Sequence, residues 1–116
     1  MPLFHWNDCQ INANYGTGSL IAHGRTVNEA RDAIRRTAKT AEYGFGRIKD
    51  LADTISQHET ALADPSTSIS YRQWIESELP DERQELADAL AKLEVDLAKD
   101  PLVIPYGEAI GINGSE

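Results

Sequence analysis

The sequence has a single cysteine, Cys9, in 116 residues, so no internal disulfide can form. Its apolar residues form no run near the roughly 18 to 20 residues that a membrane-spanning helix needs. The first segment, MPLFHWNDCQ, has no basic stretch followed by an apolar one, and no signal peptide is expected. These absences favour the reducing cytoplasm of a bacterial or infected host cell.

Signatures of catalysis and of metal binding are absent as well. The sequence contains no HExxH, GxSxG or Walker motif. Its histidines are scattered, and His5 and Cys9 would share a face only in a helix, whereas their segment is expected to be strand or coil. The Gly16-Thr17-Gly18 segment lies too far before the next expected helix for a phosphate-binding loop, which favours a hairpin turn. We therefore expect no enzymatic activity, no metal ion and no cofactor.

Acidic residues exceed basic ones, and the excess lies in one part of the chain. The net charge is −8; residues 1–49 hold seven Lys and Arg against four Asp and Glu, whereas residues 50–116 hold four against fifteen. This asymmetry is compatible with an anion-binding face, with an acidic mimic of nucleic acid, or with two halves that attract each other. Direct binding of nucleic acid is not expected, because neutralising its phosphates needs a basic surface.

A long helix is predicted over residues 27–63. Thr26 and Glu29 have the spacing of a capping box at its start. From there an apolar residue recurs every seven positions, at Val27, Ile34, Ala41, Ile48, Ile55 and Leu62. The repeat continues through Gly44 and Gly46, so we expect one helix of roughly 55 Å, with or without a kink at the two glycines.

A second helical arm is predicted over residues 70–99, after a turn at residues 64–68. Leu79, Leu86 and Leu93 recur at intervals of seven, and Asp100-Pro101 closes the run. Two arms of comparable length that are joined by a short turn fold back most simply as an antiparallel hairpin.

The two ends of the chain carry strand and turn signals. Residues 9–13 and 19–22 flank an expected turn at residues 15–18, and residues 102–106 have the character of an edge strand. The hairpin brings these segments to one end, where we expect a small sheet. The predicted fold class is α+β, mainly α, in a single domain of residues 1–116: a β hairpin (1–25), the long helix (27–63), the second arm (70–99), and a strand with a tail (101–116).

Self-association is expected because a hairpin of two helices has a thin core. A second stripe of small side chains on the second arm leaves room for another helix to approach; it consists of Ala87, Ala91, Val95 and Ala98. The protein is therefore predicted to be a homo-oligomer. The sequence leaves open whether the helices or the sheet form the interface.

One face of the predicted long helix combines cations with an aromatic ring. Arg36, Lys39, Tyr43 and Arg47 follow one another at spacings of three, four and four, opposite the apolar stripe, and Arg35 lies beside them. The cations suit phosphate oxygens, and the tyrosine ring suits stacking on a base. These five residues are the candidate site for an anionic, nucleotide-like small molecule. The alternative is a solvated basic face that pairs with the acidic arm of a neighbouring copy.

Two other functions remain open. An acidic inhibitor, acting as a mimic of nucleic acid, would bind a basic host protein through the carboxylates of the second arm. These are Glu76, Glu78, Asp81, Glu82, Glu85 and Asp88. In a structural assembly subunit, by contrast, all the helical stripes would be interfaces.

The second arm also carries a family resemblance. Residues 75–87, IESELPDERQELA, and residues 91–94, AKLE, resemble the helical hairpin of phage nucleotide-sponge proteins. Those small oligomers sequester cyclic nucleotide signals made by bacterial immune systems. The resemblance covers these two segments, and residues 94–98 depart from it. It implies a phage protein with an anti-defence role that sequesters a ligand as an oligomer, and it assigns no binding residue.

Overall fold

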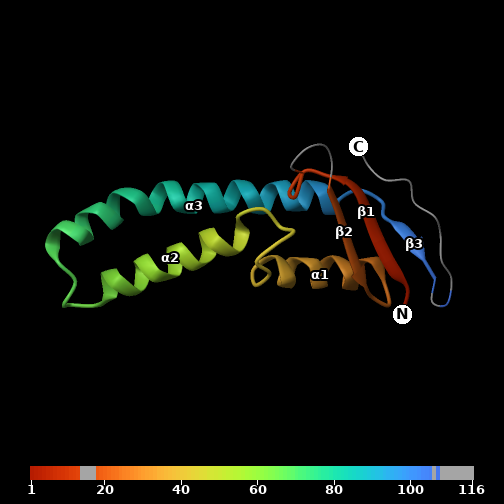
Figure 1. The fold of residues 1–116 in the computed structure, drawn as a ribbon, viewed down its shortest axis with the longest axis horizontal. Coiled ribbons are helices and arrows are strands. Elements are labelled where there is room, and N and C mark those ends of the chain that lie inside the picture. The colour runs from red at the N-terminus through yellow and green to blue at the C-terminus, as the bar shows by residue number, and fades with distance from the viewer. Residues whose placement is uncertain (14–17, 106, 108–116) are drawn as a thin grey trace.

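The computed structural model describes residues 1–13, 18–105 and 107. Along the chain these residues form β1 (Leu3–Cys9), β2 (Gly18–His23), α1 (Val27–Ala38), α2 (Ile48–Ala63), α3 (Ile69–Leu97) and β3 (Leu102–Ile104). The fold is therefore α+β with a small sheet, as predicted. The molecule is elongated, 59 × 29 × 20 Å, with the sheet at one end and the turn between α2 and α3 at the other (Figure 1).

The sheet is antiparallel, with β1 in the centre of the order β2-β1-β3. Phe4 of β1 lies opposite Ala22 of β2 and Val103 of β3. Phe4 and Trp6 are two residues apart in β1, so their side chains project from the same face of the sheet. Both are buried, because α1 covers that face. The strand predicted at residues 9–13 is wrong, since β1 occupies Leu3–Cys9 instead. Most of the turn predicted at residues 15–18 lies outside the described residues.

The single long helix predicted over residues 27–63 is also wrong. The chain leaves the helix after Ala38 and enters α2 at Ile48, and residues 39–47 connect the two. Gly44 and Gly46 have φ angles of 91° and 62°, in the left-handed region that glycine adopts at little cost. The helix has already ended at Ala38, and the two glycines allow the connection to turn before it enters α2.

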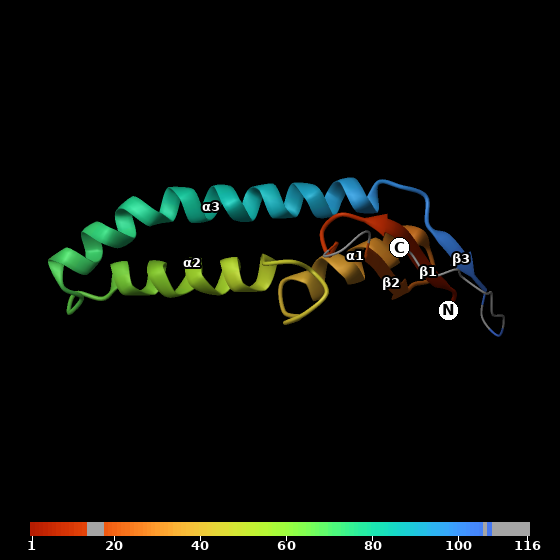
Figure 2. The ribbon, with the colours of Figure 1, turned by 45° about the horizontal axis from the view of Figure 1, so that its top comes forward.

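The two helices made from this segment pack in different places. Figure 2 shows α2 running antiparallel to α3, whereas α1 lies against the sheet. Each helix buries an apolar side chain of the same seven-residue repeat, Ile34 in α1 and Ile55 in α2. The hairpin of two comparable arms is thus present only between α2 and the first half of α3.

Helix α3 matches the predicted second arm closely. It begins after Ser68, whose hydroxyl accepts a hydrogen bond from the Tyr71 N–H at 3.3 Å. Pro80 lies inside the helix on its exposed side and does not end it. The helix has 29 residues, or about 43 Å, and is long enough to join the sheet to the distant turn.

Buried apolar side chains form two separate clusters. The head core lies between the sheet, α1, the start of α2 and the end of α3. It contains Phe4, Trp6, Cys9, Ile11, Leu20, Ala30, Ile34, Ala38, Ile48, Leu93 and Leu97. The hairpin core, between α2 and α3, contains Ile55, Ile75 and Leu79. Leu86 is partly buried against both, so α3 is the element that connects them.

Polar contacts fix the end of α3 to the head. The fully buried carboxylate of Asp96 accepts the Gln10 N–H at 2.9 and 3.0 Å and the Ile11 N–H at 2.9 Å. Trp6 donates its indole N–H to the Lys99 carbonyl at 3.0 Å, and Arg31 donates to the Leu97 carbonyl at 2.8 Å. Carbonyl groups that the helix end leaves without intrahelical partners are therefore satisfied by side chains of the head.

Candidate functional site

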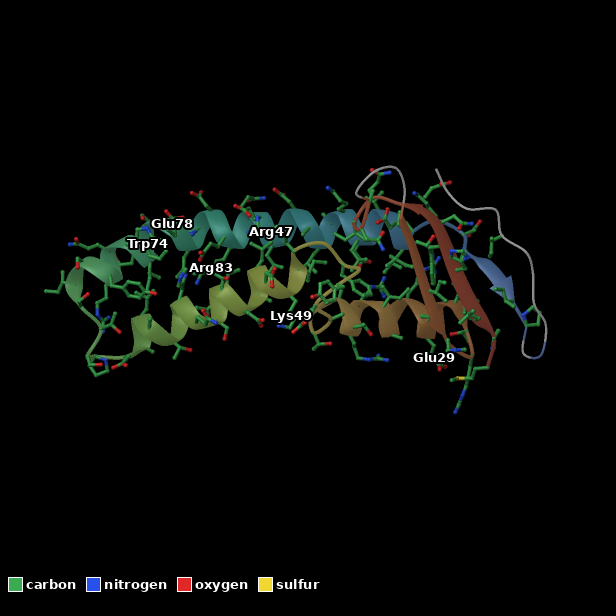
Figure 3. The ribbon with its side chains drawn as sticks, viewed as in Figure 1. Glu29, Arg47, Lys49, Trp74, Glu78 and Arg83 are labelled. Carbon is green, nitrogen blue, oxygen red and sulfur yellow. The ribbon has the colours of Figure 1, made fainter. Side chains whose placement is uncertain are left out.

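The candidate site lies where the 39–47 connection meets residues 11–12 and α3. A hollow of about 340 Å³ opens there, lined by Ile11, Gly46, Arg47, Leu51, Glu85, Asp88, Ala89 and Lys92. A second hollow of about 220 Å³ adjoins it, lined by Ile11, Asn12, Glu42, Tyr43, Gly44 and Gly46. Because the two hollows share Ile11 and Gly46, we treat them as one site, the junction site. Figure 3 shows Arg47 beside α3 at the start of α2.

The wall shared by the two hollows is held in place from several sides. The backbone of Ile11 is fixed by its hydrogen bond to the buried Asp96 of α3. Gly46 packs so close to it that a Cβ atom on Gly46 would lie 2.8 Å from the Ile11 carbonyl oxygen. Asn12 donates its side-chain amide to the Ser19 carbonyl at 2.8 Å, which ties the same segment to β2. These three contacts therefore fix the position of the shared wall in the folded chain.

Gly46→Ala should disturb this wall more than Gly44→Ala does. Both glycines have positive φ angles, which cost alanine about 1–2 kcal/mol, but a Cβ on Gly44 meets nothing within 4 Å. The Gly46 variant has the clash with the Ile11 carbonyl in addition. We expect it to lose about 2–3 kcal/mol of unfolding free energy against about 1 for Gly44→Ala, as measured by urea denaturation. Equal losses would show that the close approach to Ile11 does not matter.

Charged groups of both signs line the first hollow. Arg47 and Lys92 supply cations, and Glu85 and Asp88 supply carboxylates, over an apolar floor. The Arg47 guanidinium lies 3.2 Å from Glu85, with the two side chains 70% and 56% exposed. Such an exposed pair contributes about 0–1 kcal/mol, so Arg47 is free to exchange Glu85 for another anion.

The N-terminus of α2 opens at the same hollow. Its N-cap residue is Arg47, which makes no side-chain capping hydrogen bond. The first N–H groups of a helix have no intrahelical partners, and together with the helix dipole they attract anions. The helix end and the two cations therefore give the hollow three groups that favour a negatively charged ligand.

The five residues predicted as one ligand-binding face do not share a helix face. Arg35 is engaged by α3: it donates to both carboxylate oxygens of Glu94, at 2.8 and 2.7 Å, and to Asp32 at 2.7 Å. The hydrogen bonds from Arg35 hold the pKa of Glu94 below its usual value. This geometry makes Arg35 a structural link between α1 and α3.

The other four predicted residues are divided between α1, its end and the connection. Arg36 is exposed on α1, and Lys39 follows the helix as its C-cap. Neither lines the junction site. Tyr43, 85% exposed, lines the second hollow, and Arg47 lines the first. The structure thus brings together Tyr43 and Arg47 across adjoining hollows.

The carboxylates predicted to bind a basic partner all lie on α3, in differing environments. Glu82 is half-buried and contacts His58 of α2, and Glu85 contacts Arg47. Glu76, Asp81 and Asp88 are exposed, and Glu78 is half-buried. They therefore do not form one uniform acidic surface.

Sequence reasoning missed Lys92, Leu51 and Ile11. Glu85, Asp88 and Lys92 are spaced three and four apart, so their shared helix face was available as a signal. Ile11 gave no such signal, because it reaches α3 through tertiary contacts, the hydrogen bond to Asp96 and the packing of the head core.

The chemistry of the described residues offers few reactive groups. Burial raises the pKa of the Cys9 thiol to about 11, and the nearby Asp96 adds to the shift, so the thiol remains protonated and unreactive at neutral pH. Within residues 1–13, 18–105 and 107, no three side chains of His, Cys, Asp or Glu are grouped as metal ligands. In the same part of the chain, each helix is too short or too polar to cross a membrane.

Comparisons with known proteins give no relative from which a role can be taken. No protein-family model, curated protein or solved structure matches the chain. The function has to be argued from the junction site itself.

Proposed function

We propose that this is a non-enzymatic binding protein that captures a small anionic molecule with a planar ring, of the nucleotide class, at the junction site. The observation that supports the proposal is the convergence of Arg47, Lys92 and the uncapped N-terminus of α2 on one hollow. Phosphate oxygens match all three, since guanidinium, ammonium and helical N–H groups donate hydrogen bonds to them.

The second hollow supplies a place for the ring. Tyr43 lines it with an exposed aromatic face, and stacking of a base on such a face contributes about 1–3 kcal/mol. Ile11 and Gly46, shared by both hollows, lie between the phosphate and the ring. The first hollow alone, at about 340 Å³, is within the range of small-molecule sites.

The carboxylates of the first hollow have a part in this arrangement. The ion pair between Arg47 and Glu85 is exposed, so breaking it costs little free energy, and Arg47 can then bind the ligand phosphate. Asp88, whose carboxylate accepts the Gln84 amide at 2.9 Å, can accept hydrogen bonds from hydroxyl or amino groups of a ligand. The mixed charge therefore selects a ligand that carries donors as well as a phosphate, as nucleotides do.

Titration calorimetry with cyclic nucleotides and ADP-ribose-type nucleotides tests the proposal. We expect at least one of them to bind, and Tyr43→Ala to weaken its binding by about 5- to 100-fold, which corresponds to the loss of one stacking contact. Lys92→Ala should weaken the binding of the same ligand, because it removes a contact with the phosphate.

Arg36→Ala is the matched control, because Arg36 is an exposed cation of the predicted helical face that lies outside the junction site. Its affinity should equal that of the unchanged protein. If every nucleotide in the panel fails to bind, the proposed function is wrong. If Arg36→Ala lowers the ligand affinity as much as Lys92→Ala does, the anion binds on α1 instead.

Self-association belongs to the same proposal. Ala87, Ala91, Val95 and Ala98 are all exposed on one side of α3, and Val95 is 63% exposed. Small side chains at these spacings allow a second helix to approach closely, which supports pairing of α3 with α3 of another copy. Native mass spectrometry of the purified protein measures the number of copies and any ligand that copurifies.

A further inference from the structure

The first turns of α3 carry a pair of aromatic side chains that remain partly exposed to solvent. Tyr71 and Trp74 are 44% and 49% exposed, and their rings stack with centroids 5.9 Å apart and planes 27° from parallel. The other tryptophan, Trp6, is 1% exposed in the head core. Large exposed aromatic rings are characteristic of protein–protein contact surfaces. Figure 3 shows Trp74 near the turn end of the molecule, far from Arg47 and the junction site.

A polar pair formed by His58 of α2 and Glu82 of α3 holds the exposed ring of Trp74 in place. His58 of α2 lies edge-on to Trp74, with ring centroids 5.3 Å apart and planes at 84°. His58 is only 7% exposed, and its Nδ1 atom lies 2.7 Å from a carboxylate oxygen of Glu82. Glu82 thus orients His58, and His58 supports one side of Trp74. An exposed ring that is fixed before contact loses little side-chain entropy when a partner covers it.

Carboxylates continue the same face of α3. Tyr71, Trp74, Glu78 and Asp81 follow at spacings of three, four and three, which places them on one side of the helix. We call these four residues the aromatic–acidic face. Glu76 lies two residues beyond Trp74, about 200° around the helix, and so belongs to another side.

The charge of this face decides among its possible occupants. A second copy that docked through the same face would bring Glu78 and Asp81 against their own counterparts, which is unfavourable. Helices that bind membrane surfaces combine aromatic residues with Lys and Arg, whereas this face carries carboxylates. A cationic partner satisfies both features, because its guanidinium groups stack on aromatic rings and pair with carboxylates.

We propose that the aromatic–acidic face is a docking surface for an arginine-rich segment of a partner protein. Arginine side chains of that segment lie over the rings of Trp74 and Tyr71 and pair with Glu78 and Asp81. The surface is separate from the junction site, and the inference does not depend on the proposed ligand.

Fluorescence anisotropy of a labelled oligoarginine peptide, titrated with the full-length protein at physiological salt, tests the inference. Trp74→Ala should weaken binding about tenfold, since it removes the central ring of the face. The double variant Glu78→Gln/Asp81→Asn should weaken binding several-fold and reduce its dependence on salt concentration.

Two controls make the outcome specific. Glu76→Gln removes one exposed carboxylate from another side of α3 and should leave binding unchanged. Tyr43→Ala, which alters the junction site, should also bind the peptide normally. If Trp74→Ala binds as the unchanged protein does, the attraction is diffuse charge pairing and the inference is wrong. It is equally wrong if the peptide does not bind, or if Glu76→Gln weakens binding as much as the double variant.

Discussion

Asp96→Ala is expected to lower the free energy of unfolding by about 3–5 kcal/mol, the largest loss for any single polar side chain of the head. The carboxylate is fully buried and accepts three hydrogen bonds from the N–H groups of Gln10 and Ile11. Truncation removes the partner of both donors, of which the Ile11 N–H is buried and the Gln10 N–H part-buried. A buried unpaired donor costs about 1–3 kcal/mol, and hydrogen bonds to a charged group contribute about 1.5–3 kcal/mol each. Urea denaturation followed by far-ultraviolet circular dichroism measures the loss.

Two variants on the same helix separate this effect from a general loss of charge. Asp88→Ala removes an exposed carboxylate that, among residues 1–13, 18–105 and 107, accepts a hydrogen bond only from the Gln84 side chain, and its unfolding free energy should change by less than about 0.5 kcal/mol. Asp96→Asn keeps one carbonyl oxygen but turns a donor toward the backbone N–H groups, so its loss should approach that of the alanine variant. Equal stability of Asp96→Ala and Asp88→Ala would contradict the role assigned to the buried carboxylate.

The same substitution connects stability with the junction site. Ile11 lines both hollows, and its backbone is held by Asp96. Under conditions where Asp96→Ala remains folded, ligand affinity should fall even though Asp96 touches neither hollow. We infer that this buried carboxylate on α3 holds Ile11 in the position where it would contact the proposed ligand.

The sequence predicted the helical segments better than their arrangement. Thr26 is the N-cap of α1, with its hydroxyl accepting the Glu29 N–H at 3.2 Å, and the second arm forms as one helix. These features depend on local chemistry, which the residues themselves display. The break at residues 39–47 depends on tertiary packing, because α1 packs against the sheet whereas α2 packs against α3. The same seven-residue repeat of apolar residues arises whether its side chains pack against one structural element or against two different ones.

The candidate site shows the same limit. The sequence predicts Tyr43 and Arg47 as binding residues from their chemistry, and both line the junction site. Their predicted neighbours on the helix do not, because the connection turns away from the axis of α1 after Lys39. Lys92 and Ile11 come from segments far apart in the chain, and they are brought together by the contact of Asp96 with the backbone of residues 10–11 and by the packing of the head core.

The division into two cores leads to the other large effect. Ile75→Ala should destabilise the hairpin while leaving the head folded. Ile75 is completely buried, and its cluster has only Ile55 and Leu79 as further buried members, so the cavity cannot be refilled from a larger core. Deletion of such a side chain costs about 2–5 kcal/mol. Within the described part of the chain, Leu86 alone is partly buried against both clusters, so little packing couples the stability of the hairpin to that of the sheet.

Native-state hydrogen exchange measures where this loss appears. In Ile75→Ala we expect amides of α2 beyond Leu51 and of the first half of α3 to exchange about 30- to 1000-fold faster, corresponding to about 2–4 kcal/mol, whereas amides of β1 keep their protection. Ile69→Ala is the matched control, since the same side chain on the same helix is 75% exposed there and its removal leaves no cavity. Equal acceleration in β1 and α2 would show that head and hairpin unfold as one unit. Acceleration confined to the hairpin would establish it as an arm that opens independently while the junction site stays formed at its base.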